Sequence, residues 1–228
     1  MISLLGRTLV LLALGAAAVG AGAGLLGGYR KSLDALKLAR WMAYLTGAAF
    51  IAATLLMEVA LITHDFSVSY VAKVGSLSTP LPITIVSLWS SLEGSILYWG
   101  CVLGSSLVVF AWTSRKADPE HSSYAMGALM AVVVFFGLLV AGVGNPFVPT
   151  DLPIPLDGPG PNALLQNHVL MILHPPALYM GYVGMAIPFA MAISALLAGR
   201  LDARWMRSLR RWTMFAWAWL TLGILLGG

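Results

Sequence analysis

Residues 4–26 read "LLGRTLVLLALGAAAVGAGAGLL", an apolar run with a single charged side chain, Arg7. A transmembrane helix needs about 20 consecutive, mostly apolar residues, so this run is long enough to cross a bilayer. Further windows of the same kind are found at Leu38–Ile62, Ser95–Thr113, Tyr124–Val143 and Leu178–Leu197, and another begins at Trp212. The sequence therefore predicts an all-α, polytopic integral membrane protein with about six transmembrane helices.

The composition of the whole chain agrees with this class. Apolar residues make up 59% of the 228 positions, charged residues make up 10%, and the mean hydropathy is +0.87. Soluble domains typically contain about 25% charged residues, so a soluble globular protein is excluded. The 24 glycines suit helices that pack closely in lipid, where small residues let backbones approach. We expect one membrane domain over residues 1–228.

The basic residues are distributed unevenly between the two ends of these helices. Of the 13 lysines and arginines, all but Arg7 and Lys73 lie near the first, third or fifth connection. The positive-inside rule assigns such connections to the cytoplasm. We therefore expect an N-terminus outside, with outer connections at about residues 63–94 and 144–177. The net charge of +4 then belongs to the cytoplasmic face, and no nucleic-acid partner is expected.

The second outer connection ends in "LLQNHVLMILHPPALYMGY" (residues 164–182), which places two histidines and two prolines beside a membrane helix. Proline disfavours helical backbone in the residue before it and suits the first turn of a helix. The stretch thus predicts a short interfacial helix from Asn162 that ends at His174. From the residues alone, His174 is either a helix-capping side chain or a metal ligand. His168 lies about 120° away around the helix and cannot share a metal with it from one face.

The first outer connection contains "LWSSLEGSILYW" (residues 88–99), which offers a second candidate group. Trp89 and Glu93 are four residues apart, a spacing that puts an aromatic ring and a carboxylate on one face of a helix. Gly94 beside them allows close backbone approach. The pair suits either a functional site or the Trp/Tyr belt at a membrane interface, and the residues alone leave both open.

Three stretches together resemble the N-terminal part of the CcmF family, the haem lyase component of the system I cytochrome c maturation machinery. They read "DFSVSYVA" (65–72), "WSSLEGSILYW" (89–99) and "LLQN" followed by "HPPALYMGYVG" (164–184). The tail "WLTLGILLGG" (219–228) is similar to the approach to that family's WWD segment. The resemblance covers essentially the whole chain in the family's order.

The resemblance implies that His174 is one of two external histidines that bind haem iron axially. It also places Tyr179, Glu93 and Trp89 near the haem or the membrane interface. The family's other external histidine, its membrane-embedded histidines and its WWD segment would all lie beyond Gly228. We therefore expect an incomplete site for b-type haem in transit, in either a natural split subunit or a truncated reading frame. Whether the chain alone is an enzyme stays open.

The function that the resemblance implies is that of a subunit or N-terminal fragment of the cytochrome c haem lyase in the bacterial inner membrane. It would handle haem at the outer face for thioether attachment to apocytochrome c. The implied partners are a polypeptide with the WWD segment and the remaining histidines, the haem chaperone CcmE, CcmH and CcmI-type apocytochrome-handling proteins, and apocytochrome c. The alternatives are a membrane transporter or channel component, and a purely structural assembly subunit. A transporter should carry ionisable residues near mid-membrane, and the only acid well inside a predicted helix is Glu58, which lies near an outer end.

Overall fold

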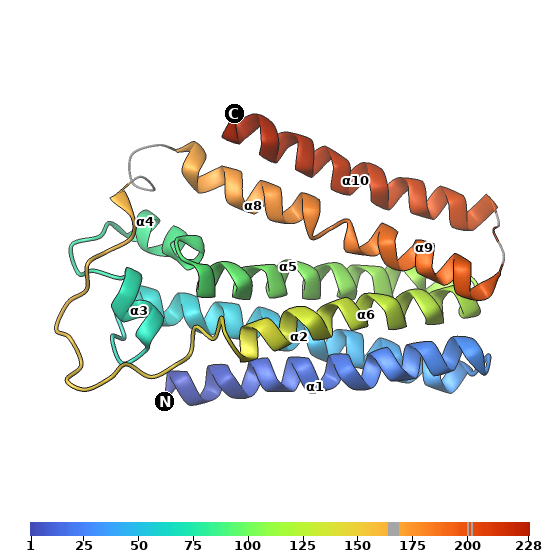
Figure 1. Cartoon of the computed structure of the whole chain (residues 1–228), viewed down its shortest axis with the longest axis horizontal. Coiled ribbons are helices and arrows are strands. Elements are labelled where there is room, and N and C mark those ends of the chain that lie inside the picture. The colour runs from blue at the N-terminus through green and yellow to red at the C-terminus, as the bar shows by residue number, and fades with distance from the viewer. Residues whose placement is uncertain (164–168, 200, 202) are drawn as a thin grey trace.

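The structure is a computed structural model that describes residues 1–163, 169–199, 201 and 203–228. Its long helices run side by side, and successive spans alternate in direction, with α8 and α9 following one another in a single span (Figure 1). They are α1 (Ile2–Tyr29), α2 (Leu33–Ile62), α5 (Leu92–Thr113), α6 (Pro119–Ala141), α8 (Leu170–Tyr182), α9 (Ala186–Ala198) and α10 (Ala203–Gly227). The prediction of an all-α, polytopic membrane protein is confirmed.

Five segments of the described chain are long and apolar enough to cross a membrane. They are α1, α2, α5 with its short continuation to Lys116, α6, and α8 with α9 as one span, Ile172–Ala198. The sixth predicted helix is α10, which begins at Ala203 and not at Trp212. Arginine is a good helix former, so the arginine-rich segment before Trp212 extends the helix. With 25 residues α10 is about 37 Å long at 1.5 Å per residue.

Local capping explains where two of these helices begin. The Ser32 side chain accepts a hydrogen bond from the Ala35 N–H at the start of α2. Asp118 does the same for the Glu120 and His121 N–H groups at the start of α6, where Pro119 occupies the first turn. Such side chains satisfy N–H groups that have no partner within the helix.

Glycines let α1 and α6 approach until their backbones touch. A Cβ at Gly24 would lie 2.5 Å from the backbone N of Gly127, and one at Gly127 would lie 2.6 Å from the backbone N of Leu25. The Ser123 hydroxyl also donates to the Gly24 carbonyl at 3.0 Å. The packing by small residues that the sequence indicates is thus present between these two helices.

The prediction that a helix ends at His174 is wrong. Helix α8 runs from Leu170 to Tyr182 and contains Pro175 and Pro176 in its interior. Prolines are tolerated inside transmembrane helices because neighbouring helices and local adjustments satisfy the backbone groups that they leave unpaired. The local preference of Pro175 is therefore overridden by packing, and His174 lies on a helix and not at a corner.

The two ends of the bundle differ in their connections. The loop end carries the N-terminus, residues 63–91 and 142–163, and Gly228, whereas the basic end carries the α1–α2 and α5–α6 connections, the end of α9 and the start of α10 (Figure 1). Both outer connections are shorter than the predicted loops 63–94 and 144–177, because α5 already begins at Leu92 and α8 at Leu170. The 3-10 helix η2 (Ser114–Lys116) lies at the basic end. Three more short helices lie at the loop end: α3 (Ser69–Val74), α4 (Leu81–Val86) and the 3-10 helix η1 (Ser87–Trp89).

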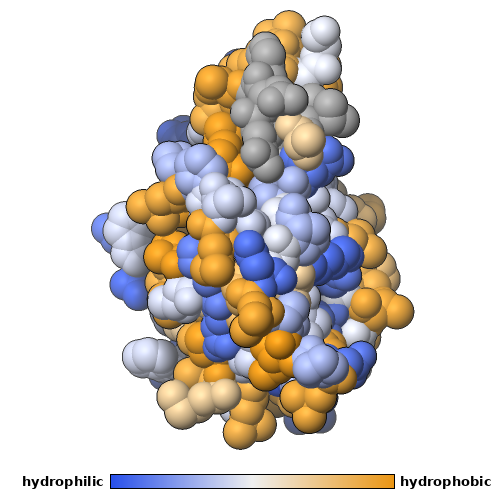
Figure 2. Space-filling model, turned by 90° about the vertical axis from the view of Figure 1, so that its left-hand side faces the viewer, coloured by the Kyte–Doolittle hydropathy of each residue, from blue (hydrophilic) through white to orange (hydrophobic). Residues whose placement is uncertain are grey.

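Hydrogen bonds join the two long connections at the loop end. The Ser69 N–H donates to the Val148 carbonyl and the Thr150 N–H donates to the Ser67 carbonyl, both at 2.9 Å. Asp157 accepts from the Leu77 N–H at 2.8 Å, and this hydrogen bond lowers the pKa of its carboxyl. Hydrophilic and hydrophobic residues alternate over the resulting face (Figure 2).

Candidate functional site

The imidazole of His174 lies between α8 and α10 and is half-buried. Its Nδ1 atom is 2.7 Å from the carbonyl oxygen of Gly223. Because a carbonyl oxygen can only accept, Nδ1 carries the proton and Nε2 of the neutral ring keeps its lone pair. Histidines that bind metals usually donate their other ring N–H in this way, which fixes the tautomer and the ring orientation. In the neutral ring, Nε2 is therefore the nitrogen through which His174 could bind a metal.

Three glycines create the space for this contact. A Cβ at Gly227 would come 2.3 Å from Cε1 of His174, and a Cβ at Gly223 would come 2.8 Å from the backbone N of Leu178. On α8, a Cβ at Gly181 would come 2.4 Å from the backbone N of Leu220. Real Cβ atoms do not approach other atoms so closely, so only glycine permits this spacing of α8 and α10. Gly223 is the functional residue that the sequence analysis missed, although its four-residue spacing from Gly227 is a signal of close packing.

Tyr179 and Trp89 belong to one aromatic cluster between α5 and α8. The ring centroids are 5.3 Å apart for Trp89 and Tyr98, 5.6 Å for Tyr98 and Tyr179, and 5.7 Å for Tyr179 and Trp99. Tyr179 is five residues from His174, about 140° around the helix, so it faces α5 whereas His174 faces α10. The structure thus places Tyr179 and Trp89 in one cluster, whereas His174 contacts α10.

Two indole groups of this cluster have buried donors without acceptors. The Nε1 atoms of Trp89 and Trp99 are inaccessible and have no hydrogen-bond partner within the described part of the chain. Buried donors are normally paired, so an unpaired one marks a place for a water, an ion or a ligand. An oxygen with a lone pair is the kind of acceptor that such donors require.

Glu93 takes part in an ion pair that connects α3 with α5. Its carboxylate oxygens are 2.9 and 3.1 Å from Nζ of Lys73, and Oε2 accepts from the Ser91 hydroxyl at 3.2 Å. The prediction that Trp89 and Glu93 share a helical face is wrong. The backbone is extended at Ser91 (φ −139°, ψ 168°), which separates η1 from α5. Gly94 does sit at a close approach, since a Cβ there would overlap the Leu88 carbonyl.

Of the other histidines, the two that the structure describes do not join His174. His64 lies at the end of α2, where its Nε2 is 3.1 Å from the Ser76 carbonyl oxygen, and His121 lies at the start of α6 at the basic end. His168 lies outside the described residues. Among the residues that the structure describes, no three histidine, cysteine or acidic side chains group together as a metal site would require.

Residues 89–228 of the chain match the family model described as Cytochrome C assembly protein. This match covers more than half of the sequence and includes α5, α8, α10 and His174. The chain belongs to the cytochrome C assembly protein family. Family membership confirms the resemblance that was predicted from the three sequence stretches.

Several curated relatives are cytochrome c-type biogenesis proteins named CcmF. The chain is 38% identical over 227 residues to the cytochrome c-type biogenesis protein CcmF of Pseudomonas aeruginosa, which covers 100% of this chain and 34% of that protein. It is 36% identical over 204 residues to CcmF of Escherichia coli, with 90% of this chain and 31% of that protein covered. The chain therefore spans about a third of the length of these relatives.

A solved structure agrees with this assignment. The chain matches "Cytochrome c Heme Lyase CcmF" with a TM-score of 0.85 and 34% sequence identity, covering 98% of this chain and 35% of that one. The described helices thus follow the arrangement of a solved member of the cytochrome C assembly family. The name of that solved protein describes a haem lyase.

Proposed function

We propose that the chain handles haem at its loop end as part of a cytochrome c haem lyase, with His174 as one axial ligand of the iron. The observation that carries the proposal is the hydrogen bond from His174 Nδ1 to the Gly223 carbonyl at 2.7 Å. It leaves Nε2 as the only ring nitrogen with a lone pair, as an axial ligand requires. The loop end faces outward if the basic end is cytoplasmic.

The proposed chemistry is thioether formation between haem vinyl groups and the cysteine thiols of an apocytochrome CxxCH motif. Each thiol sulfur bonds to one vinyl carbon, the thiol proton goes to the other carbon, and the C=C bond becomes single, so no net oxidation occurs. The substrates supply both reacting groups, and the protein supplies position. His174 would hold the iron from one side, and the indole donors of Trp89 and Trp99 offer hydrogen bonds to a carboxylate. Glu93 and Tyr179 are proposed to border this haem-facing region or the interface.

The proposed assembly needs other polypeptides. One axial ligand from the described residues leaves the opposite side of the iron to another group, which we assign to a polypeptide with the WWD segment and a second external histidine. The haem chaperone CcmE would deliver haem, and CcmH and CcmI-type proteins would present apocytochrome c. The proposed location is the bacterial inner membrane, with the N-terminus on the periplasmic side.

The test uses the chain co-expressed with a polypeptide that carries the WWD segment. We expect His174→Ala to abolish the haem absorbance of the purified complex, since the axial nitrogen is lost, without loss of the folded chain. His174→Gly should regain part of that absorbance with added imidazole, which can enter the vacated position as a ligand. The matched control is His64→Asn at the same end, because asparagine tolerates the positive φ of 53° at that position.

Two results would contradict the proposal. Normal haem content and normal cytochrome c maturation in the His174→Ala strain would return His174 to a packing role between α8 and α10. An equal loss in His64→Asn would show that the loop end as a whole, and not the His174 nitrogen, determines haem content.

A further inference from the structure

A cavity of about 500 Å³ lies at the basic end, between α5, α6, α9 and the first half of α10. This volume falls within the range of about 300–1,000 Å³ typical of ligand sites. Its walls are mainly apolar and aromatic and include Val109, Phe110, Ala125, Met191, Trp212 and Phe215. The cavity is at the opposite end of the bundle from His174 and is not needed for the proposed haem handling.

One stripe of α10 lines the cavity with positive charge. Arg204, Ser208, Arg211 and Phe215 face it, at spacings of four, three and four residues that place them on one side of a helix. Neither of the two arginines has an ion-pair or hydrogen-bond partner within the described part of the chain. The cavity therefore presents two guanidinium groups beside an apolar wall.

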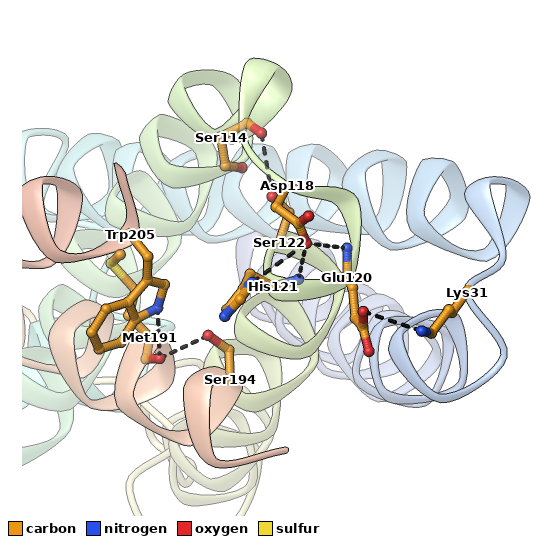
Figure 3. Close-up of polar contacts among 9 residues, drawn as sticks. All are labelled: Lys31, Ser114, Asp118, Glu120, His121, Ser122, Met191, Ser194 and Trp205. Carbon is orange, nitrogen blue, oxygen red and sulfur yellow. Dashed lines mark hydrogen bonds and ion pairs between the residues drawn. The ribbon is translucent and has the colours of Figure 1, made fainter. Parts of the chain in front are cut away.

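The acid that also lines the cavity is already engaged. Asp118 Oδ1 accepts from the Glu120 and His121 N–H groups at 3.0 and 3.1 Å and lies 3.4 Å from Nδ1 of His121 (Figure 3). Glu120 is directed away, toward Lys31, at 3.6 Å (Figure 3). Since Asp118 serves the start of α6, the charge that the cavity offers to a ligand comes from Arg204 and Arg211.

A buried hydroxyl at the cavity wall has no partner. Ser114 is 7% exposed and lines the cavity, and its Oγ atom has no hydrogen-bond partner in the described residues. Its carbonyl oxygen, by contrast, accepts from the Ser122 hydroxyl at 3.4 Å (Figure 3) and from Arg40 at 3.3 Å. An unpaired buried hydroxyl normally requires a water or a ligand atom, so this wall is prepared for a polar group.

A hydrogen bond at the edge of the cavity joins α10 to α9. The Trp205 indole N–H donates to the Met191 carbonyl at 3.2 Å, and the Ser194 hydroxyl donates to the same oxygen at 2.7 Å (Figure 3). The Trp205 bond fixes the start of α10 to α9, whereas the Ser194 bond lies within α9. The cavity lies beside this hydrogen bond, between α10 and the ends of α5 and α6.

We propose that this cavity binds an anionic phospholipid, with its phosphate between Arg204 and Arg211 and an acyl chain along the apolar wall. Arginine binds phosphate oxygens through paired N–H donors, and basic pockets between membrane helices bind anionic lipid head groups. The site lies at the end of spanning helices. A lipid there would place its head group beside the arginines and its acyl chain beside the apolar wall. The lipid would fill the cavity between α10 and the α5–α6 pair, beside the ring contacts of Phe110 with Trp212 and of His121 with Trp205.

The experiment measures lipid binding by the delipidated full chain in a neutral detergent, by native mass spectrometry. The probes are phosphatidylglycerol and phosphatidylcholine with identical acyl chains. We expect one retained phosphatidylglycerol, and at least tenfold weaker binding of it in the Arg204→Gln/Arg211→Gln variant, because two charges near the head group are lost. The control is Arg207→Gln/Arg210→Gln, which removes the same charge from α10 outside the cavity lining and should stay within twofold of the wild type.

A second variant tests the cavity without changing charge. Ser208→Trp should fill the space from the partly exposed side of α10 and displace phosphatidylglycerol. Equal losses in the two arginine pairs would overturn the proposal in favour of a diffuse basic surface. Equal binding of phosphatidylglycerol and phosphatidylcholine would also overturn the proposal. Displacement of the lipid by excess inorganic phosphate would overturn it too, because it would indicate a simple anion site.

Discussion

The carboxylate of Glu93 and the ammonium group of Lys73 form an ion pair across a separation of 20 residues. Their side chains are 27% and 53% exposed, respectively, so water screens the pair. Exposed pairs typically contribute about 0.2–1 kcal/mol to the free energy of unfolding. The sequence offered Glu93 as either a functional carboxylate or an interfacial one, and the ion pair is a structural reason for its presence.

We expect Glu93→Gln and Lys73→Met each to lower the free energy of unfolding by less than about 1 kcal/mol, with a coupling of similar size in the double variant. Denaturant unfolding of the four proteins measures this coupling. The more exposed Asp34–Lys37 pair on α2 is the control and should show a smaller coupling. Cytochrome c maturation should fall equally in the two single variants. A much larger loss in Glu93→Gln alone would give this carboxylate a role beyond the ion pair.

At the level of elements, the position of His174 depends on how closely α8 and α10 approach. The separation is set by Gly181, Gly223 and Gly227, each of which meets the opposite helix at a distance that excludes a Cβ. The Gly223 carbonyl is also the acceptor for His174 Nδ1. One residue thus determines both the spacing of the two helices and the orientation of the imidazole.

Gly223→Ala should push α10 away from Leu178, because the added Cβ would lie 2.8 Å from its backbone N. We expect a loss of about 1–3 kcal/mol in the free energy of unfolding, as for overpacked interiors, and a loss of haem absorbance in the complex. Thermal unfolding and the haem spectrum measure the two effects. Gly22→Ala on α1 is the control: its Cβ meets nothing within 4 Å, so it should be neutral or slightly stabilising. Unchanged haem absorbance in Gly223→Ala would show that the spacing of α8 and α10 does not determine the orientation of the His174 imidazole.

For the whole molecule, the distribution of charge predicts the orientation in the membrane. The loop end and the basic end lie at opposite ends of the helices, and both termini lie at the loop end (Figure 1). Because basic connections are retained in the cytoplasm, we predict that the loop end is periplasmic. The same orientation would place the proposed lipid site at the cytoplasmic leaflet.

Cysteine labelling of intact cells tests this orientation. In a Cys101→Ala background, a membrane-impermeant maleimide should label Ser78→Cys at the loop end and spare Ala203→Cys at the basic end, where both positions are exposed. Labelling after membrane disruption is the control, and it should modify both positions. Labelling of residue 203 and not of residue 78 in intact cells would reverse the topology, and with it the proposed outer location of His174.

Several features of the protein follow from the sequence by itself. The apolar windows predict the transmembrane helices because helix formation and transfer into lipid depend on about 20 adjacent residues. The motif around His174 and the stretch from Trp89 to Trp99 indicate the family that the comparisons confirm. These signals are local, so they can be read without knowing how the helices pack.

The remaining features depend on contacts between distant residues. His174 meets Gly223 across 49 positions, and Glu93 meets Lys73 across 20. Local rules placed the end of a helix at His174, but the packing of α8 with its neighbours keeps Pro175 and Pro176 inside a helix. The histidine tautomer and the cavity on α10 arise from the spacing between helices. Only the tertiary structure decides this spacing, because it depends on the backbone approach that glycines on two helices permit together.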